Sequence, residues 1–211
     1  MPRLTKAAAK KRRQDLITVA AQLFLKQGYE NTTINQIINN LNLAKGTYYY
    51  HFQSKEDILI AVSDKLISDT QKKLVAIHKQ NEKDVLWRIR EILSIFHDDF
   101  YQNRTIWKLV YHDNNIAMHK QVSKIGARRF TPLITDVLQE GMGENLVHVP
   151  HARETAQVLI SIFDIFSRQL CVAREHDKRE RIFETFRYII GQVLGKDCIP
   201  EFSSSKEFKR K

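Results

Sequence analysis

Glycine and proline are scarce in this sequence, which has seven glycines and four prolines where average usage gives roughly 25 of the two together. So few turn-forming residues disfavour an all-β fold, which needs a turn about every 8–12 residues. The two cysteines, Cys171 and Cys198, are too few for a disulfide framework. No charge-free run approaches the roughly 18 residues that span a membrane. The basic start at residues 1–13 leads into an amphipathic pattern rather than the apolar stretch of a signal peptide. We therefore expect a cytoplasmic protein with no membrane segment.

Charge is distributed unevenly along the 211 residues, whose net charge is +10. Residues 1–55 contain nine basic and two acidic side chains, a net charge of +7, whereas the rest of the chain contributes only +3. A basic excess at one end is typical of a nucleic-acid-binding segment. A solvated basic face explains the charge alone equally well. The hydrophobic share of 43% excludes a disordered chain.

Apolar side chains recur at helical spacing along almost the whole chain, and no strand pattern is evident, so the sequence predicts an all-α fold. Gly28 is placed to end the first helix and Thr33 to cap the second. Ser54 and Asp57 form a capping box at the start of a long fourth helix, and the glycines within 141–143 are expected to end the seventh. The expected helices span about residues 10–27, 34–41, 45–51, 54–78, 82–101, 104–113, 116–140, 152–174 and 178–194.

A tight turn at residues 41–43 joins the second and third expected helices. Two helices joined so closely form the helix-turn-helix arrangement, in which the second helix enters the major groove of DNA. Asn42 occupies the position of this turn that needs a left-handed backbone, which asparagine tolerates better than most residues. The pattern therefore favours a DNA-binding unit at the basic end of the chain.

Three segments have a specific spacing. They read Thr-Thr-Ile-Asn-Gln-Ile at 32–37, Ala-Lys-Gly-Thr-Tyr-Tyr-Tyr-His-Phe at 44–52 and Ser-Lys-Glu-Asp at 54–57. Together they resemble the DNA-binding domain of the TetR family of bacterial transcriptional repressors, continuously from about residue 16 to residue 59. The resemblance implies a three-helix DNA-binding domain followed by a larger helical domain for ligand binding and dimerisation. Ala44 departs from the family's common serine and so lacks a capping hydroxyl.

The third helix has two faces with different expected roles. Tyr48 and Phe52 are four residues apart, so they share one face and should pack on the first two helices. Tyr49, Tyr50 and His51 then point toward the duplex, where a phenol or imidazole can donate to phosphate oxygens and a ring can contact a thymine methyl.

The start of the third helix offers the best candidates for reading base edges, Lys45 and Thr47. Gly46 lets the helix approach the sugar-phosphate backbone without an intervening side chain. Thr33 and Lys55 stand at the starts of the second and fourth helices, where free N–H groups favour an anion, and we assign them to phosphates. For reading base edges, the resemblance implies the same positions, Lys45 and Thr47.

The first helix begins with a basic run, residues 10–13, preceded by Arg3 and Lys6. These side chains could reach the DNA backbone or the minor groove. For any one of them, a solvated surface charge is an equally good interpretation.

The last two long helices are apolar over more than one face, which predicts a second partner for each. The resemblance implies that they pair with their copies in a twofold homodimer as a four-helix bundle. Burial within one chain is the alternative. The residues assigned to the dimer interface are Phe163, Phe166, Phe186 and Ile190.

Aromatic and soft side chains at helical spacing in the middle of the chain are candidates for an effector pocket that takes a small apolar or aromatic molecule. An ordinary core has the same appearance. The tentative effector-binding residues are Trp87, Phe96, Phe100, Trp107, Tyr111, Met118 and Phe130.

Catalytic and metal-binding patterns are weak in this sequence. His97-Asp98 and His112-Asp113 resemble paired metal ligands, but neighbours on a helix diverge by about 100°. No Cys–His cluster with zinc spacing, nucleophile elbow or phosphate-binding glycine loop is present. We expect no metal, no cofactor and no enzymatic activity.

The sequence thus divides into a DNA-binding domain at 1–55, an effector-binding and dimerisation domain at 56–199 and a disordered tail at 200–211. The resulting hypothesis is a repressor released from a palindromic operator by a small molecule, with the long fourth helix as the connection between pocket and DNA. The alternative is a DNA-bound adaptor whose C-terminal domain binds a protein.

Overall fold

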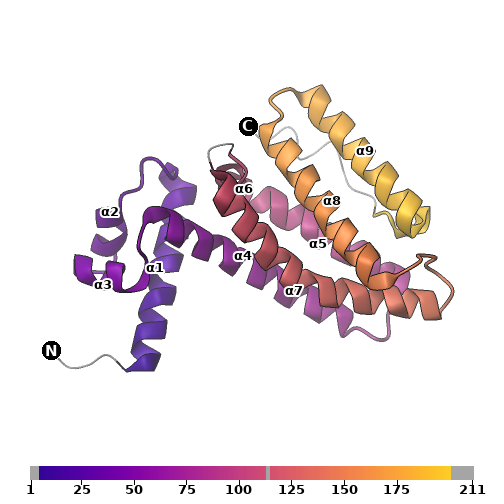
Figure 1. Ribbon diagram of the computed structural model, residues 1–211, viewed down its shortest axis with the longest axis horizontal. Helices are drawn as coiled ribbons and strands as arrows, with labels where there is room; N and C mark the ends of the chain where they lie inside the picture. Colours follow the sequence, from indigo (N-terminus) through magenta and orange to yellow (C-terminus); the bar gives the residue numbers. More distant parts are fainter. Residues whose placement is uncertain (1–4, 113–114, 201–211) are drawn as a thin grey trace.

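The chain folds as an all-α protein in the computed structural model, which describes residues 5–112 and 115–200 (Figure 1). Every predicted helix is present, with ends within four residues of those expected. The predicted tail begins at Pro200, which is buried, and its remaining residues lie outside the described part of the chain. The helices are α1 (Lys6–Gln27), α2 (Ile34–Asn39), α3 (Lys45–His51), α4 (Lys55–His78), α5 (Val85–Gln102), α6 (Arg104–Val110), α7 (Ile116–Gly143), α8 (Ala152–Val172) and α9 (His176–Leu194), followed by a 3₁₀ turn at Lys196–Cys198.

The predicted caps of the N-terminal helices are confirmed. Gly28 ends α1 with a positive φ of 84°. At the start of α2, Thr33 Oγ1 accepts a hydrogen bond from the N–H of Gln36 at 3.2 Å, and Gln36 Oε1 accepts one from the N–H of Thr33 at 2.8 Å. Ser54 Oγ accepts from the N–H of Asp57 at 3.1 Å where α4 begins. These local bonds fix where each helix starts.

The end of α7 differs from the expectation. The helix continues through the glycines and ends at Gly143. A Cβ at Gly141 would lie 2.8 Å from the side chain of Val147, a residue of the connection to α8. Gly141 is therefore needed for the close approach of this connection rather than for ending the helix, and the turn itself uses Asn145, whose φ is 59°.

Helix α4 belongs to both parts of the molecule. Helices α1–α3 form an N-terminal unit, and α4 leaves it to run along a larger bundle, where it packs against α5 and α7 (Figure 1). Ile58, Leu59 and Val62 are buried near its start, where it contacts α1, and Ile67 and Leu74 are buried further along. One continuous helix thus contributes to the cores of both parts.

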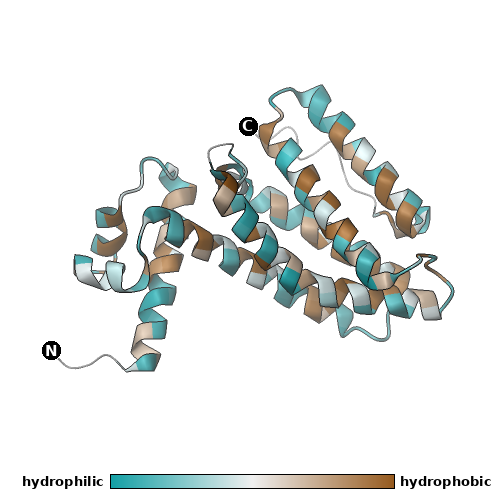
Figure 2. Ribbon diagram, viewed as in Figure 1, coloured by the Kyte–Doolittle hydropathy of each residue, from teal (hydrophilic) through white to brown (hydrophobic). Residues whose placement is uncertain are grey.

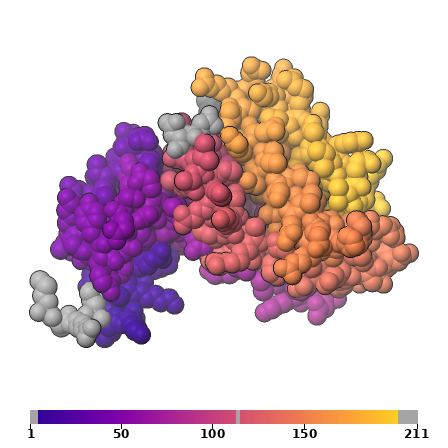
Figure 3. Space-filling model, viewed as in Figure 1, coloured from indigo at the N-terminus to yellow at the C-terminus, as the bar shows by residue number. Residues whose placement is uncertain are grey.

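A second connection, which the sequence did not predict, runs through α6. This short helix contacts α1 of the N-terminal unit as well as α8. Figure 3 shows pink atoms from the middle of the chain directly against the purple N-terminal unit. The expectation that α4 alone joins the two parts is therefore wrong, because α6 also lies between them.

Helix α8 is long and apolar enough to cross a membrane by length and composition, with a mean hydropathy of 1.2 over 18 residues. A core helix of a globular protein passes the same test, so one such helix is weak support for a membrane span. Here α8 packs against α6, α7 and α9, and the carboxylate of Asp164 in its middle is hydrogen-bonded to neighbouring helices. A charged group at the centre of a span would be costly, so we treat α8 as a bundle helix.

A buried ion pair joins α5 to α7. The side chain of Arg88 is 2% exposed, and its guanidinium donates to both carboxylate oxygens of Glu140, through Nη1 at 2.8 Å and through Nη2. The hydrogen bond from Arg88 lowers the pKa of Glu140 below its ordinary value. A bidentate pair of this kind fixes two helices in angle as well as in distance.

Replacing Glu140 by alanine leaves the Arg88 guanidinium buried without its partner. We expect the free energy of unfolding to fall by about 3 kcal/mol, the lower end of the range for a broken buried pair, because the side chain of Glu140 is itself 37% exposed. Urea denaturation at pH 7 measures this, with Asp136→Ala, an exposed site on the same helix, as the matched control. Because the pKa of Glu140 is lowered in the folded protein, the difference between wild type and variant should be present at neutral pH and shrink as pH falls below about 4. Equal stabilities of the two variants at pH 7 would contradict this role.

Candidate functional site

The turn between α2 and α3 sets the orientation of α3. Asn42 has a φ of 50°, the left-handed conformation predicted for it. The N–H of Leu43 donates to the carbonyl oxygen of Ile38 at 3.0 Å, which holds the turn against the end of α2. Ala44 is the residue just before α3, and it provides no side-chain cap, as its missing hydroxyl predicts. The two helices therefore form the expected helix-turn-helix arrangement.

The predicted faces of α3 are confirmed. Tyr48 and Phe52 are 0% and 3% exposed, and the Tyr48 hydroxyl donates to the carbonyl oxygen of Ser54 at 2.8 Å. Burial raises the pKa of this phenol above its usual value. Tyr49 and Tyr50 are 42% and 74% exposed on the other side. One side of α3 is therefore core, and the other is a free surface.

The start of α3 is open to solvent. Lys45 and Gly46 are exposed and Thr47 is partly exposed. A Cβ added at Gly46 would meet nothing within 4 Å. The packing of this chain therefore does not require glycine here, and any close approach that does require it must come from outside the chain.

Lys55 is not the free cation that the sequence suggested. Its ammonium donates to the carbonyl oxygen of Tyr29 at 2.9 Å and lies 4.0 Å from the centre of the Tyr29 ring. Lys55 therefore also ties the start of α4 to the segment after α1. An ammonium group has three N–H donors, so the group retains donors for a phosphate, but removing it also removes an internal contact.

The exposed hydroxyl of Thr33 is likewise engaged, in the capping box with Gln36.

Basic side chains of α1 lie close to the end of α3. The guanidinium of Arg13 lies 5.1 Å from the centre of the Phe52 ring. The pKa of His51 is lowered, first by burial and then by the charges of Arg13 and Arg12. Lys10 and Lys11 of the basic run and Lys6 before it are exposed, while Arg3 lies outside the described residues. The exposed face of α3 is thus adjoined by positive charge from α1.

The larger bundle contains a partly open cavity of about 640 Å³, with walls drawn from α4 to α9. Its walls are mostly aliphatic and aromatic. Five of the seven tentative effector residues line it. These five are Phe96, Phe100, Trp107, Tyr111 and Phe130.

Trp87 and Met118 do not line this cavity. Trp87 lies in the first turn of α5, where its backbone N–H donates to the side chain of the capping Asp84 at 2.7 Å. The ammonium of Lys83 lies 5.5 Å from the centre of its ring. Met118 is buried, but its position on α7 is not among those that face the cavity. Helical spacing found the apolar residues but did not show which of them share one space.

Polar residues at one end of the cavity were missed by the sequence reasoning. Asp164 of α8 accepts hydrogen bonds through Oδ1 from the hydroxyls of Tyr111 and Ser123, both at 3.0 Å. His119 Nε2 lies 2.9 Å from Asp164 Oδ2. Burial, followed by the charge of Asp164, raises the pKa of Tyr111 well above its usual value. A lone carboxylate within the apolar run 158–172 was the available signal.

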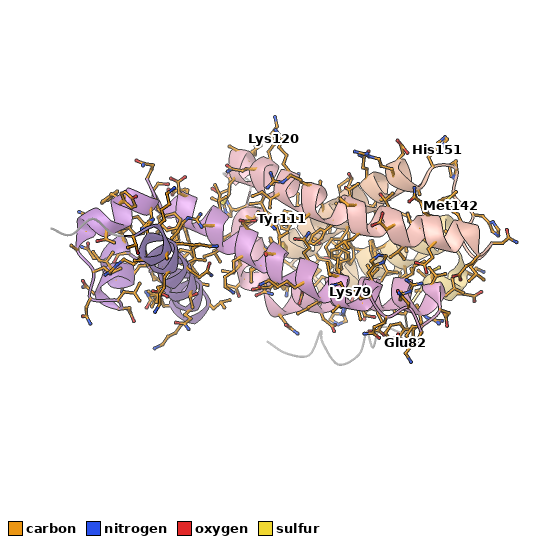
Figure 4. All side chains as sticks on the ribbon, turned by 90° about the horizontal axis from the view of Figure 1, so that it is seen from below. Lys79, Glu82, Tyr111, Lys120, Met142 and His151 are labelled. Carbon is orange, nitrogen blue, oxygen red and sulfur yellow. The ribbon has the colours of Figure 1, made fainter. Side chains whose placement is uncertain are left out.

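These polar residues lie at the end of the bundle that faces the N-terminal unit. Figure 4 shows Tyr111 and Lys120 near that unit, whereas Met142 and His151 lie at the opposite end of α7 and beyond it. Tyr111 follows directly after α6, the helix that contacts α1. The polar end of the cavity is therefore the end from which the N-terminal unit can be reached.

A second carboxylate, Asp99 of α5, also lines the cavity but already has a cationic partner. Its Oδ2 accepts from the Thr70 hydroxyl at 2.7 Å, and its Oδ1 accepts from the ammonium of Lys73. Both partners belong to α4. This group links α4 to α5 across one wall of the cavity.

The residues assigned to the dimer interface lie mainly in the interior of one chain, and the fourth of them, Phe163, is partly buried. Phe166, Phe186 and Ile190 are 6%, 7% and 2% exposed, so they are buried within one chain. The rings of Phe166 and Phe186 stack at 4.1 Å between centres, and Phe163 lies 5.0 Å from Phe96 across the cavity wall. These side chains hold α9 and α5 to α8.

A different face of α8 is apolar and exposed. Val158, Ile165 and Val172 are 56%, 57% and 57% exposed, and they are seven residues apart, which places them along one stripe of the helix. On α9, Tyr188 and Ile189 are 68% and 36% exposed. Figure 2 shows apolar segments recurring along α8 between polar ones. The stripe on α8 is the surface available to a second copy.

Among the described residues, neither His97 nor His112 belongs to a group of three potential metal ligands. His97 Nδ1 lies 3.1 Å from Asp98 Oδ1, closer than helical geometry suggested, but Asp113 of the second pair lies outside the described residues. In the described ranges, the potential ligand group found is His176, Asp177 and Glu180, and all three side chains are exposed.

Comparisons with known proteins agree with this geometry. The family model described as bacterial regulatory proteins of the tetR family matches residues 16–62. An uncharacterised helix-turn-helix transcriptional regulator from the lacX 3′ region of Lactococcus lactis is 30% identical over 137 residues, 64% of this chain and 67% of that protein. The probable acrEF/envCD operon repressor of Escherichia coli is 40% identical over 58 residues, 28% of this chain and 26% of that protein.

A crystal structure of a TetR-family transcriptional regulator from Pectobacterium atrosepticum has the same fold. It superposes with a TM-score of 0.71 over 90% of this chain and 97% of its own, at 17% identity.

Proposed function

Because this chain belongs to the TetR family of bacterial transcriptional regulators, we propose that it is a cytoplasmic repressor. It binds a palindromic operator as a homodimer and is released by a small molecule held in the cavity. The observation that carries this proposal is the position of α6, which contacts α1 of the DNA-binding unit and contributes Trp107 to the cavity wall. The matched relatives are named as regulators, which supports a binding role over an enzymatic one.

The exposed face of α3 is the proposed surface for base recognition. Lys45 and Thr47 at its start contact base edges, while Tyr49, Tyr50 and His51 contact phosphates and thymine methyl groups. Helices α2 and α4 precede and follow α3 in the chain. At their N-termini, Thr33 and Lys55 contact phosphates. Positive charge from α1 adds an attraction that does not depend on base sequence.

The cavity is the proposed effector site. Its volume of about 640 Å³ is in the usual range for small-molecule sites, roughly 300–1,000 Å³. A ligand there touches α4 at Ile67 and α6 at Trp107, the two helices that contact the DNA-binding unit. Binding that favours one placement of these helices changes the separation of the two recognition helices in the dimer.

The adaptor alternative requires a surface for a protein partner. The exposed stripe on α8 is the apolar surface that would serve it, but in our proposal this stripe is covered by the second copy. The mostly apolar cavity inside the bundle has no role in the adaptor alternative, and it therefore supports a small-molecule effector.

We expect Gly46→Ala to separate folding from DNA binding. Alanine in a helix should raise the free energy of unfolding by about 0.5–1 kcal/mol, because a Cβ here meets nothing within the chain. Operator affinity should fall at the same time, because the methyl group intrudes between α3 and the DNA backbone. Fluorescence anisotropy with labelled DNA from upstream of the gene, together with urea denaturation, measures both quantities. Gly143→Ala, at the equally open end of α7, is the control. Unchanged operator affinity in Gly46→Ala would remove this residue from the interface.

We expect Val158→Glu to yield a folded monomer, because this side chain is exposed in one chain, does not line the cavity, and would place a charge in the contact between two copies. Leu146→Glu, an exposed leucine outside α8 and α9, should remain dimeric. Phe166→Asp should unfold the protein instead, since that ring is buried and stacked. Sedimentation velocity and thermal denaturation distinguish the three outcomes. A Val158→Glu protein that stays dimeric at micromolar concentration would show that the interface lies elsewhere.

We expect effector and operator to weaken each other's binding by the same factor, typically about 5–150-fold for coupled sites. Calorimetric titration of an effector into the protein with and without saturating operator gives the factor from one side. Operator titration with and without effector gives it from the other. Equal effector affinities in the two titrations would mean that the cavity is not coupled to DNA, and the adaptor alternative would then be preferred.

A further inference from the structure

The polar end of the cavity contains an acceptor that is held in place but not neutralised by a fixed cation. Asp164 is positioned by Tyr111, Ser123 and His119, one from the end of α6 and two from α7. Among the described residues, no lysine or arginine lies within 4 Å of its carboxylate. Its side chain remains 27% exposed. Two carboxylate oxygens offer about four acceptor positions, so three partners leave room for another donor.

The other carboxylate of the cavity shows what a completed pair looks like here. Asp99 is 12% exposed, and both of its oxygens are bonded, one to the Thr70 hydroxyl and one to the Lys73 ammonium. Asp164 has hydroxyls and an imidazole in the corresponding places. The difference between the two carboxylates is therefore the missing cation at Asp164.

The rest of the wall selects an apolar body. Phe96, Phe130 and Phe163 lie together, with ring centres 4.9 Å and 5.0 Å apart for the pairs that include Phe96. Such rings bury hydrocarbon and also attract a cation through their faces. An apolar molecule that ends in an ammonium group satisfies both the walls and the carboxylate.

Two lysines border the rim of the cavity, and by charge alone they favour an anion. Lys120 and Lys124 of α7 border the cavity, but both side chains are exposed, and Figure 4 shows Lys120 on the outer side of the bundle. Ion pairs made in solvent contribute little. The carboxylate inside the cavity is less hydrated and therefore discriminates more strongly between charges.

We propose that the effector is an amphipathic cation, an apolar or aromatic molecule that carries a protonated amine, and that Asp164 receives its ammonium group. This inference rests on the proposed function, because it names the class of ligand for the same cavity. It also explains why the polar group lies next to α6: the charged end of the ligand contacts Tyr111, the residue that follows this helix.

The test uses three probes with one alkyl chain and different head groups: decylammonium, 1-decanol and decanoate, each below its aggregation concentration. The chain has two tryptophans, and Trp107 lines the cavity whereas Trp87 does not. A Trp87→Phe background therefore leaves Trp107 as the fluorescent reporter of binding. We expect decylammonium to bind about tenfold or more tightly than either of the other two probes, as a charge-assisted hydrogen bond provides.

Asp164→Asn in the same background should weaken decylammonium binding about tenfold or more and decanol binding less than about threefold. Asp136→Asn, which removes one exposed charge from α7, should change neither affinity. Decanoate or decanol binding as tightly as decylammonium in the parent protein overturns the proposal, and so does undetectable decylammonium binding. Those comparisons need no variant at Asp164. An unchanged head-group preference in folded Asp164→Asn also overturns it.

Operator release is measured separately, by anisotropy of the labelled upstream DNA with each probe. Cation-selective binding through Asp164 without release would support the ligand class while contradicting the proposed function. Release by decanol or decanoate, without any preference for the ammonium, would support the proposed function while contradicting the ligand class.

Discussion

The continuity of helix α4 is the constraint on which the rest of the structure depends. Its capped start is fixed to the DNA-binding unit by Ser54, its first apolar residues are buried where it contacts α1, and its middle supplies Ile67 and Thr70 to the cavity wall. Its 24 residues form one hydrogen-bonded rod about 36 Å long. A rod of this kind does not absorb a displacement internally, so a change of packing at the cavity appears as a rotation at the other end. The pair between Lys73 and Asp99 attaches the C-terminal half of this rod to α5.

The contact between α6 and α1 determines what kind of motion is available. If α4 were the sole connection, the DNA-binding unit could swivel about it with little cost, and the spacing of two recognition helices in a dimer would be poorly defined. A second point of contact removes that freedom. It also places α6 between the cavity and the DNA-binding unit, with Trp107 on one side and the α1 contact on the other. A ligand that shifts α6 therefore changes a defined geometry rather than an already loose one, which is the condition for a two-state response.

Much of this fold could be predicted from local signals in the sequence, because they act over four residues or fewer. The caps at Thr33 and Ser54, the left-handed turn residue Asn42 and the buried face of Tyr48 all follow from spacing and residue type. The exposed face of α8 could not be predicted in the same way. Helix α8 is apolar on two arcs, and periodicity cannot say which arc faces its own chain. Phe166 proved to belong to the inner arc and Ile165, its neighbour, to the outer one. The same limit explains why Trp107 lines the cavity and Trp87 does not, since nothing in their spacing distinguishes them.

Two polar groups in the bundle show how charge is divided between stability and recognition. Arg88 and Glu140 balance each other's charge through two hydrogen bonds at the junction of α5 and α7, and this ion pair needs no ligand. Asp164 accepts hydrogen bonds from two hydroxyls and lies beside the His119 imidazole, and among the described residues no lysine or arginine lies within 4 Å of its carboxylate. Keeping an uncompensated carboxylate beside an apolar cavity has a cost in stability, whereas an asparagine there could keep hydrogen bonds to the same neighbours. Under the proposal that Asp164 receives a cationic ligand, this charge serves recognition rather than folding. Its position next to α6 would then place ligand binding beside the helix that contacts the DNA-binding unit.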